Sequence, residues 1–210
     1  MKTLVNHKEY DAIEEKLSAE PRLANEGWAL HDHTKTTAHP LHRICDGVFL
    51  KYYTDDEAVR MASVFLKHGA SINGNEQIPG TDTPLIAAAS LHADQVAMLY
   101  IEHGADIHHP GTHGGTALHW AAWCGRPVVV KRLLEAGAQV QVLCNDFKST
   151  PLFWAVHGSK NHKGSPDHTR CVQLLLDAGS DSTLPNKDGK TVFDLLDGPD
   201  DPMRAVLQRN

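Results

Sequence analysis

Thr83-Pro84-Leu85-Ile86-Ala87-Ala88 is the stretch that decides the fold, because the chain repeats it. It returns as Thr116-Ala117-Leu118-His119-Trp120-Ala121 and again as Thr150-Pro151-Leu152-Phe153-Trp154-Ala155. A less regular copy, His39-Pro40-Leu41-His42-Arg43-Ile44, precedes them. The three threonines follow one another at intervals of 33 and 34 residues. A fixed period of this length indicates an array of one supersecondary unit.

A glycine follows each copy after 21 to 30 residues, and the residues before it form a helical pattern. The positions seven, four and three residues before the glycine are apolar in all four units, which places them on one helix face. They are Ala62, Phe65 and Leu66 before Gly69; Ala97, Tyr100 and Ile101 before Gly104; Val130, Leu133 and Leu134 before Gly137; and Val172, Leu175 and Leu176 before Gly179. The glycine supplies the left-handed residue that ends this helix, and the Thr-Pro start opens an earlier one. Each unit is therefore predicted to be a pair of helices.

This pattern resembles the ankyrin repeat, whose signature is a 33-residue period with T-P-L-H-x-A, from about residue 37 to the C-terminus. The resemblance implies an all-α solenoid of stacked helix pairs, with hairpin-like fingers such as residues 106–115 and 139–149 between units. The sequence departs from the family at both ends. His39 stands where the family has threonine, and the last copy, Thr191-Val192-Phe193-Asp194, has no histidine. Terminal repeats with one polar face are expected to differ in this way.

We expect three segments along the chain: a helical N-terminal cap at 1–36, four ankyrin repeats at 37–186, and a C-terminal capping repeat at 187–210. In the first segment, Ile13 and Leu17 are spaced for one face of a helix. In the last, Asp201 precedes a proline, as at the start of a helix.

Two insertions lengthen the first and fourth repeats, at 46–56 and 158–169, where each pair of helices joins. The first contains Phe49, Tyr52 and Tyr53. It either lengthens its helix and packs on the N-terminal cap or serves as a second contact edge. The second insertion is predicted to be a polar loop.

Composition and charge exclude several classes of function. The 210 residues carry a formal charge of −6, so we expect no nucleic-acid partner. The apolar runs are too short to span a membrane, and the N-terminus lacks the apolar stretch of a secretory signal. The four cysteines form no C-x-x-C pair. We therefore expect a cytoplasmic protein with reduced thiols and no cofactor, acting as a monomer.

Catalytic motifs are missing from the sequence, so no enzyme is predicted. It contains no H-E-x-x-H, G-x-S-x-G or G-x-G-x-x-G. Gly189-Lys190-Thr191 looks like the end of a phosphate-binding loop, but Leu184 stands where that loop requires glycine.

Fifteen histidines make metal binding an alternative that must be weighed. His42 and His119 occupy the histidine position of the motif, which in the family bonds backbone and threonine groups, and His68 and His103 are expected at helix ends. Two local clusters remain: His108, His109 and His113 on one finger, and His157, His162 and His168 with Asp167 and Cys171 near the second insertion. Imidazole and thiolate bind zinc or nickel, but the irregular spacing argues against a preformed site. No metal is predicted, and a histidine-based metal-binding or pH-sensing protein stays the alternative function.

Aromatic side chains indicate the candidate site for a protein partner. Trp123 falls where the family usually has a small or polar residue facing its concave groove, and Phe147 falls at a finger position that is normally exposed. A large apolar residue without a core role points to partner contact, although both could instead pack on the second insertion or on each other. The predicted partner-binding residues are Trp123, Phe147, His113, Leu91, His157, Trp120 and Trp154; for the last two, packing between repeats is the other interpretation. The predicted function is a non-catalytic protein-interaction module, a stand-alone adaptor or an inhibitor or regulator of another protein.

Overall fold

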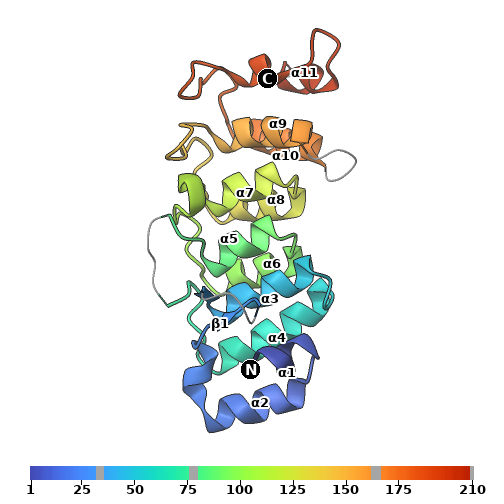
Figure 1. Cartoon of the computed structure of the whole chain (residues 1–210). Helices are drawn as coiled ribbons and strands as arrows, with labels where there is room; N and C mark the ends of the chain where they lie inside the picture. The colour runs from blue at the N-terminus through green and yellow to red at the C-terminus, as the bar shows by residue number, and fades with distance from the viewer. Residues whose placement is uncertain (32–35, 76–79, 162–166, 209–210) are drawn as a thin grey trace. The chain divides into compact units, whose positions relative to one another are not determined.

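A computed structural model describes residues 1–31, 36–75, 80–161 and 167–208 of the chain (Figure 1). These residues fold into two compact units. The first unit comprises residues 1–75 and 82–106, and the second comprises residues 80–81 and 107–208.

The first unit contains two helix pairs that follow an N-terminal group of short elements. Its elements are α1 (Lys2–Asn6), α2 (Tyr10–Ala19), the 3-10 helix η1 (Pro21–Ala24), β1 (Trp28–Ala29), β2 (Thr37–Ala38), α3 (Pro40–Phe49), α4 (Asp55–Lys67), α5 (Pro84–Ser90) and α6 (Asp94–Glu102). α3 packs on α4 and α5 packs on α6, while α3 also contacts α5 and α4 contacts α6. The two pairs thus stack in two layers. The antiparallel strands β1 and β2 join the predicted N-terminal segment to the start of the first repeat.

The second unit repeats this arrangement. Its elements are η2 (Thr112–Gly114), α7 (Ala117–Trp123), α8 (Pro127–Glu135), α9 (Pro151–Asn161), α10 (His168–Asp177), η3 (Val192–Leu195) and α11 (Pro202–Leu207). α7 contacts α9, α8 contacts α10, and α11 packs on α10. The all-α prediction is confirmed. None of the helices in the described ranges is long and apolar enough to cross a bilayer.

The repeat glycines end their helices as the sequence predicts. Gly69, Gly104, Gly137 and Gly179 have φ values of 85°, 77°, 93° and 89°. A side chain would be strained in this left-handed conformation, so glycine is the residue that allows the chain to leave the helix there.

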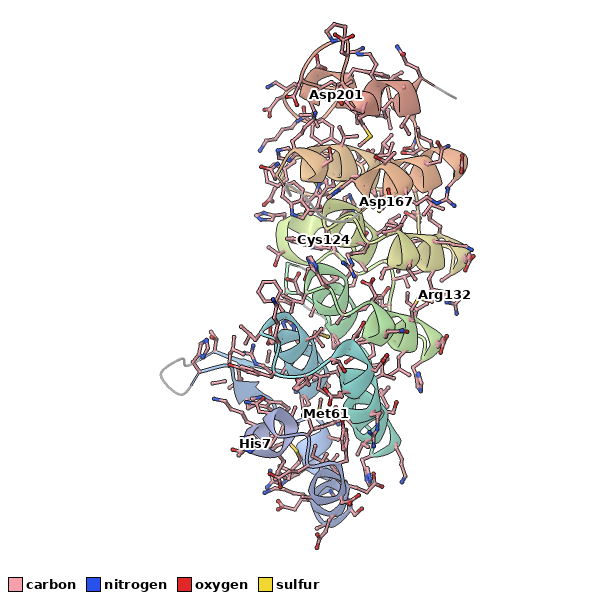
Figure 2. All side chains as sticks on the ribbon, turned by 90° about the vertical axis from the view of Figure 1, so that its right-hand side faces the viewer. His7, Met61, Cys124, Arg132, Asp167 and Asp201 are labelled. Atoms are coloured by element: carbon pink, nitrogen blue, oxygen red, sulfur yellow. The ribbon has the colours of Figure 1, made fainter. Side chains whose placement is uncertain are left out.

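The predicted apolar stripes form the core of each unit. Phe65 and Tyr100 are fully buried in the first unit, and Leu133 and Leu175 in the second. Met61 on α4 also lies in the core of the first unit (Figure 2). The stripe positions nearest the glycine are buried to different extents: Leu66 and Leu134 are only half-buried.

His39 takes over the capping role that threonine has in the other repeats. Thr83 Oγ1 accepts a hydrogen bond from the Ile86 backbone N–H at the start of α5. At the start of α3, the acceptor is His39 Nδ1, 3.3 Å from the backbone nitrogen of Leu41. Burial is the main cause that lowers the pKa of His39, to about 4, and the charge of the neighbouring His42 is the second cause. The imidazole is therefore neutral at pH 7 and can accept this bond.

The first insertion lengthens α3 to Phe49, as one of its two interpretations predicts. Tyr53 is buried, and its hydroxyl donates to the backbone oxygen of Ile44 at 3.1 Å. Phe49 and Tyr52 are 56% and 46% exposed. Its use as a contact edge stays a prediction.

The second insertion corrects the sequence-based prediction of a loop. Residues 158–161 continue α9, and His162 with the following residues to 166 lies outside the described part of the chain. Lys160 on this added turn forms ion pairs with Asp197, at 2.9 Å, and with Asp201. Burial alone would raise the pKa of Asp201, but the Lys160 bond and two backbone N–H groups lower it to about 2. The insertion therefore helps to hold α11, which Asp201 caps.

Replacing Leu133 with alanine should lower the free energy of unfolding by about 2 to 5 kcal/mol, because it removes a fully buried side chain from the stripe of α8. Val128→Ala is the matched control, since Val128 on the same helix is 56% exposed. Urea unfolding of both variants measures the difference. Equal losses would contradict the assignment of Leu133 to the core.

Replacing His39 with threonine should reduce the loss in free energy of unfolding that occurs when the pH is lowered. The folded-state pKa of about 4 lies below the unfolded value of about 6.5. As the pH falls below 6.5, His39 is protonated in the unfolded chain but stays neutral in the folded chain. Lowering the pH from 7 to 5 therefore reduces the free energy of unfolding by about 2 kcal/mol through His39. Urea unfolding at both pH values should show a smaller loss for His39→Thr. An unchanged loss would show that His39 titrates normally.

Candidate functional site

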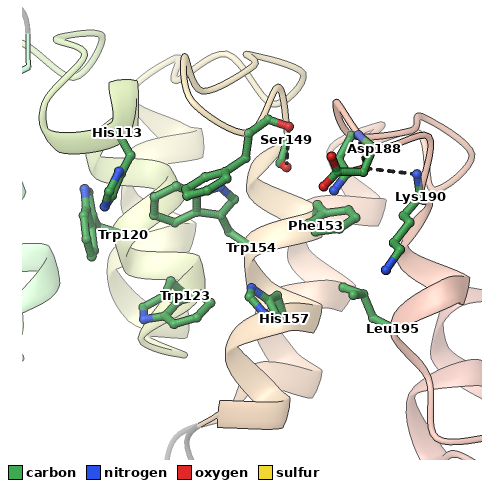
Figure 3. A pocket seen from close by; sticks show the side chains of 12 residues that line it. His113, Trp120, Trp123, Ser149, Phe153, Trp154, His157, Asp188, Lys190 and Leu195 are labelled. Carbon is green, nitrogen blue, oxygen red and sulfur yellow. Dashed lines mark hydrogen bonds between the residues drawn. The ribbon is translucent and has the colours of Figure 1, made fainter.

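An open groove of about 510 Å³ lies in the second unit (Figure 3). Two helices, α7 and α9, form its floor, the finger at 139–149 forms one side, and the segment after α10 forms the other. Its lining residues are His113, Trp120, Trp123, Phe147, Ser149, Phe153, Trp154, His157, Asn186, Asp188, Lys190 and Leu195.

Trp154 is the centre of the aromatic floor. Its ring centroid lies 5.2 Å from that of Trp120, 6.1 Å from that of Trp123 and 6.4 Å from that of Phe147. The rings meet at 82°, 74° and 62°, so they pack edge to face, which is a favoured geometry for aromatic pairs. Trp154 is only 6% exposed, whereas Phe147 is 39% exposed. The buried indole thus supports the more accessible rings around it.

Helical spacing explains why these rings meet. Trp120 and Trp123 are three residues apart on α7, and Phe153 and His157 are four apart on α9, so each pair shares one face of its helix. The His157 ring lies 5.0 Å from that of Trp123 and 6.5 Å from that of Phe153. Burial lowers the pKa of His157, so its neutral form is favoured in this aromatic setting.

A buried imidazole beneath the floor fixes the finger to α7. His119 Nδ1 lies 3.1 Å from the backbone nitrogen of Thr116 and 3.0 Å from its hydroxyl, and Nε2 lies 3.1 Å from the backbone oxygen of Ser149. Burial lowers the pKa of His119 to about 4, although hydrogen bonds to Ser149 and Val142 oppose the shift. The neutral ring therefore accepts from Thr116 N–H and donates to Ser149. This confirms the structural role that the sequence assigns to His119. Its partner on the finger, Ser149, is two residues from Phe147.

A close approach of α9 to the end of α7 sets the width of the floor. A Cβ atom on Gly158 would lie 2.2 Å from the backbone oxygen of Trp123, so α9 can pass there only with glycine. His168 Nε2 lies 2.9 Å from the same oxygen. The sequence groups His168 with possible metal ligands, but the structure buries it in this contact.

The opposite wall is polar and is held by a turn. Asn186 Oδ1 accepts hydrogen bonds from the backbone N–H groups of Asp188, at 3.0 Å, and Lys190, at 2.9 Å. The side chains of Asp188 and Lys190 are exposed, and neither forms an ion pair within the described residues. Lys187 Nζ lies 5.1 Å from the centroid of Phe147, which links this wall to the finger.

His113 completes the rim of the groove. Its Nδ1 lies 2.8 Å from Asp146 Oδ2, and its ring is 5.3 Å from that of Phe147. The backbone of His113 has a φ of 60°, and its carbonyl accepts from the N–H groups of Asn145 and Asp146. Successive fingers are thereby joined at this edge.

The groove contains six of the seven residues predicted to bind a partner. Leu91 is the exception: it is half-buried at the end of α5, in the first unit, and does not line the groove. For Trp123 and Phe147 the sequence left open partner contact or packing within the chain. Both rings pack on Trp154 and also line the groove.

Sequence reasoning missed the rest of the lining. Phe153 carried a usable signal, because it replaces the histidine of the repeat motif with a large apolar residue. Asn186, Asp188 and Lys190 belong to a turn that the residues Asn-Lys-Asp-Gly at 186–189 indicate, but nothing in the sequence places this turn in the lining.

The histidine clusters do not form a ligand set in the described part of the chain. His109 Nε2 lies 3.0 Å from the backbone oxygen of Thr81. Among the described residues, no three His, Cys, Asp or Glu side chains are grouped so that they could hold a metal ion. His162 lies outside those residues.

The stacked helix pairs, fingers and repeat glycines define a class of protein. The model of ankyrin repeats in three copies matches residues 50–143, and the model of a single ankyrin repeat matches residues 148–187. The chain belongs to the ankyrin repeat family.

Similar proteins include much longer chains. Palmitoyltransferase ZDHHC13 of Mus musculus is 31% identical over 136 residues, which cover 60% of this chain and 21% of that protein. Palmitoyltransferase Hip14 of Drosophila melanogaster is 34% identical over 42% of this chain and 13% of its own length. Ankyrin repeat and SOCS box protein 6 of Homo sapiens is 32% identical over 64% of this chain and 31% of its own length. The chain thus spans less than a third of these relatives.

Replacing Trp123 with alanine should lower the free energy of unfolding by only about 1 kcal/mol, because the ring is half-buried and packs edge to face on Trp154 and His157. Trp154→Ala should cost about 3 to 5 kcal/mol, since it empties the centre of the floor. Urea unfolding of the two variants gives the comparison. A loss for Trp123→Ala as large as that for Trp154→Ala would make Trp123 a core residue.

Proposed function

We propose that this chain is a non-catalytic protein-interaction module and that a segment of its partner binds in the aromatic groove of the second unit. Ankyrin repeats mediate protein–protein binding, which supports the first part of this proposal. The observation that carries the second part is the gathering of three of the four tryptophans of the chain on one open surface. Tryptophans in such pockets are the residues that most often dominate binding energy.

Rigidity of the floor favours this function. Trp154 is buried, His119 fixes the finger, and Gly158 fixes the spacing of the two helices. A surface that is ordered before binding loses little conformational entropy on association.

The polar groups of the groove do not favour catalysis. The Ser149 hydroxyl donates to the backbone oxygen of Phe147, 3.2 Å away, and the nearest buried imidazole, His119, is bonded at both nitrogens. This arrangement offers no activated nucleophile. The similarity to the two palmitoyltransferases covers 21% and 13% of their length, so it supports no catalytic activity for this chain.

We further propose that the protein acts in the cytoplasm as a monomer, either as an adaptor or as an inhibitor or regulator of its partner. All four cysteines are buried free thiols, as is usual in a reducing compartment.

Affinity capture from the native host tests the proposed site. Wild-type protein, Trp123→Ala and the control Val128→Ala are compared, because Val128 is exposed in the same unit and lies outside the groove lining. We expect a retained protein that is common to wild type and Val128→Ala and is reduced at least tenfold with Trp123→Ala. The same retained proteins in equal amounts from all three would contradict the groove as the binding site.

A further inference from the structure

We propose that the segment bound in the aromatic groove is an uncharged, proline-containing peptide in the extended polyproline II conformation. This inference rests on the proposed function and names the chemistry of the partner at the same site. Three features of the groove carry it: the spacing of its rings, the balance of its charges and the donors on its polar wall.

Ring spacing shows where an occupant can lie. The centroids are 5.2 Å apart for Trp120 and Trp154 and 5.0 Å apart for Trp123 and His157. A group sandwiched between two rings needs parallel faces about 7 Å apart, because each contact takes about 3.5 Å. These pairs are closer and meet at 82° and 65°, so neither pair sandwiches an ammonium or methyl group. The proposed occupant lies across the aromatic surface, where flat apolar rings such as those of proline can pack.

Charge on the lining favours a neutral occupant. Asp188 and Lys190 are the residues of the lining that are formally charged at pH 7, and their charges cancel. A chain whose net charge is −6 would otherwise be expected to select a basic partner. An uncharged segment matches the groove in charge, and a strongly basic or acidic segment would not.

The polar wall supplies hydrogen-bond donors in a fixed orientation. Asn186 Oδ1 is held by the two backbone N–H groups of Asp188 and Lys190, so its amide nitrogen is left as a donor. The amide nitrogen of Asn186 has no hydrogen-bond partner among the described residues, and Lys190 Nζ adds a second donor on the same wall. Such a wall recognises backbone carbonyls.

A polyproline II segment provides those carbonyls and the apolar rings together. Its backbone forms no internal hydrogen bonds, and Pro-rich segments of this kind dock on aromatic-lined grooves. Strand addition is less suited to this site, because the strands within the described residues, β1 and β2, belong to the first unit. The aromatic floor would take proline rings, and the Asn186 amide would donate to a carbonyl between them.

Binding of synthetic peptides to the full chain tests the proposal, with tryptophan fluorescence as the readout. The first peptide is an uncharged 12-residue chain with proline at every third position and alanine or leucine elsewhere. The second has alanine in place of each proline, and the third carries trimethyllysine. We expect the proline peptide to bind at least tenfold more tightly than the other two.

Two variants locate the site and separate its roles. Trp123→Ala should weaken binding of the proline peptide at least tenfold. Asn186→Asp keeps the oxygen that accepts both backbone bonds and removes the amide donor, so it should weaken binding three- to tenfold without lowering the melting temperature. Val128→Ala, at an exposed position outside the lining, should bind as wild type does.

The proposal is overturned if the proline peptide does not bind at about 1 mM, if the alanine peptide binds equally well, if trimethyllysine binds more tightly, or if Asn186→Asp binds as wild type does. Such a failure leaves the proposed function standing when Trp123→Ala still loses the captured protein. If Trp123→Ala captures what wild type captures, the proposed function itself is wrong.

Discussion

The buried imidazole of His119 is the interaction on which the groove depends. Its two nitrogens join the start of α7, at Thr116, to the finger, at Ser149, and its ring packs 5.2 Å from that of Trp154. The bond from the Thr116 N–H requires the neutral ring, whose Nδ1 accepts it, and burial keeps the ring neutral by lowering its pKa to about 4. An aliphatic side chain could fill the space but could not satisfy the buried N–H of Thr116 or the carbonyl of Ser149. One polar residue thereby sets the position of a finger thirty residues further along the chain.

Much of the fold could be predicted from the sequence, because the motif and the glycine recur at a regular spacing and mark where the helices of each repeat begin and end. A stripe such as Val130, Leu133 and Leu134 needs only helical periodicity to be read, and the following glycine marks the end of the helix. What could not be read depends on residues far apart in sequence. Residues 158–161, which the sequence predicts as loop, continue α9, and Lys160 among them pairs with Asp197 and Asp201, some forty positions away. Tertiary contacts of this kind can override local propensity.

The candidate site could be predicted in its aromatic part. Trp123 and Phe147 stand out because a large apolar residue occupies a position that the repeat leaves small, polar or exposed. Their dependence on Trp154 could not be foreseen, since edge-to-face packing is a matter of geometry between α7, α9 and a finger. The place of Asn186 in the lining could not be predicted either. Asn186-Lys187-Asp188-Gly189 indicates a turn, but nothing in the sequence places that turn against the aromatic floor.

Rigid aromatic surfaces and oriented donors suit a chain that recognises another protein without altering it. The claim that the aromatic groove receives the partner can be measured directly by photo-cross-linking in the native host. A photoreactive phenylalanine is placed at Phe147, on the rim of the groove, and in a second protein at Val128, an exposed position outside the groove lining. The account predicts one discrete cross-linked partner from position 147 and none from position 128. A partner that is cross-linked equally from both positions, or from position 128 alone, would contradict it.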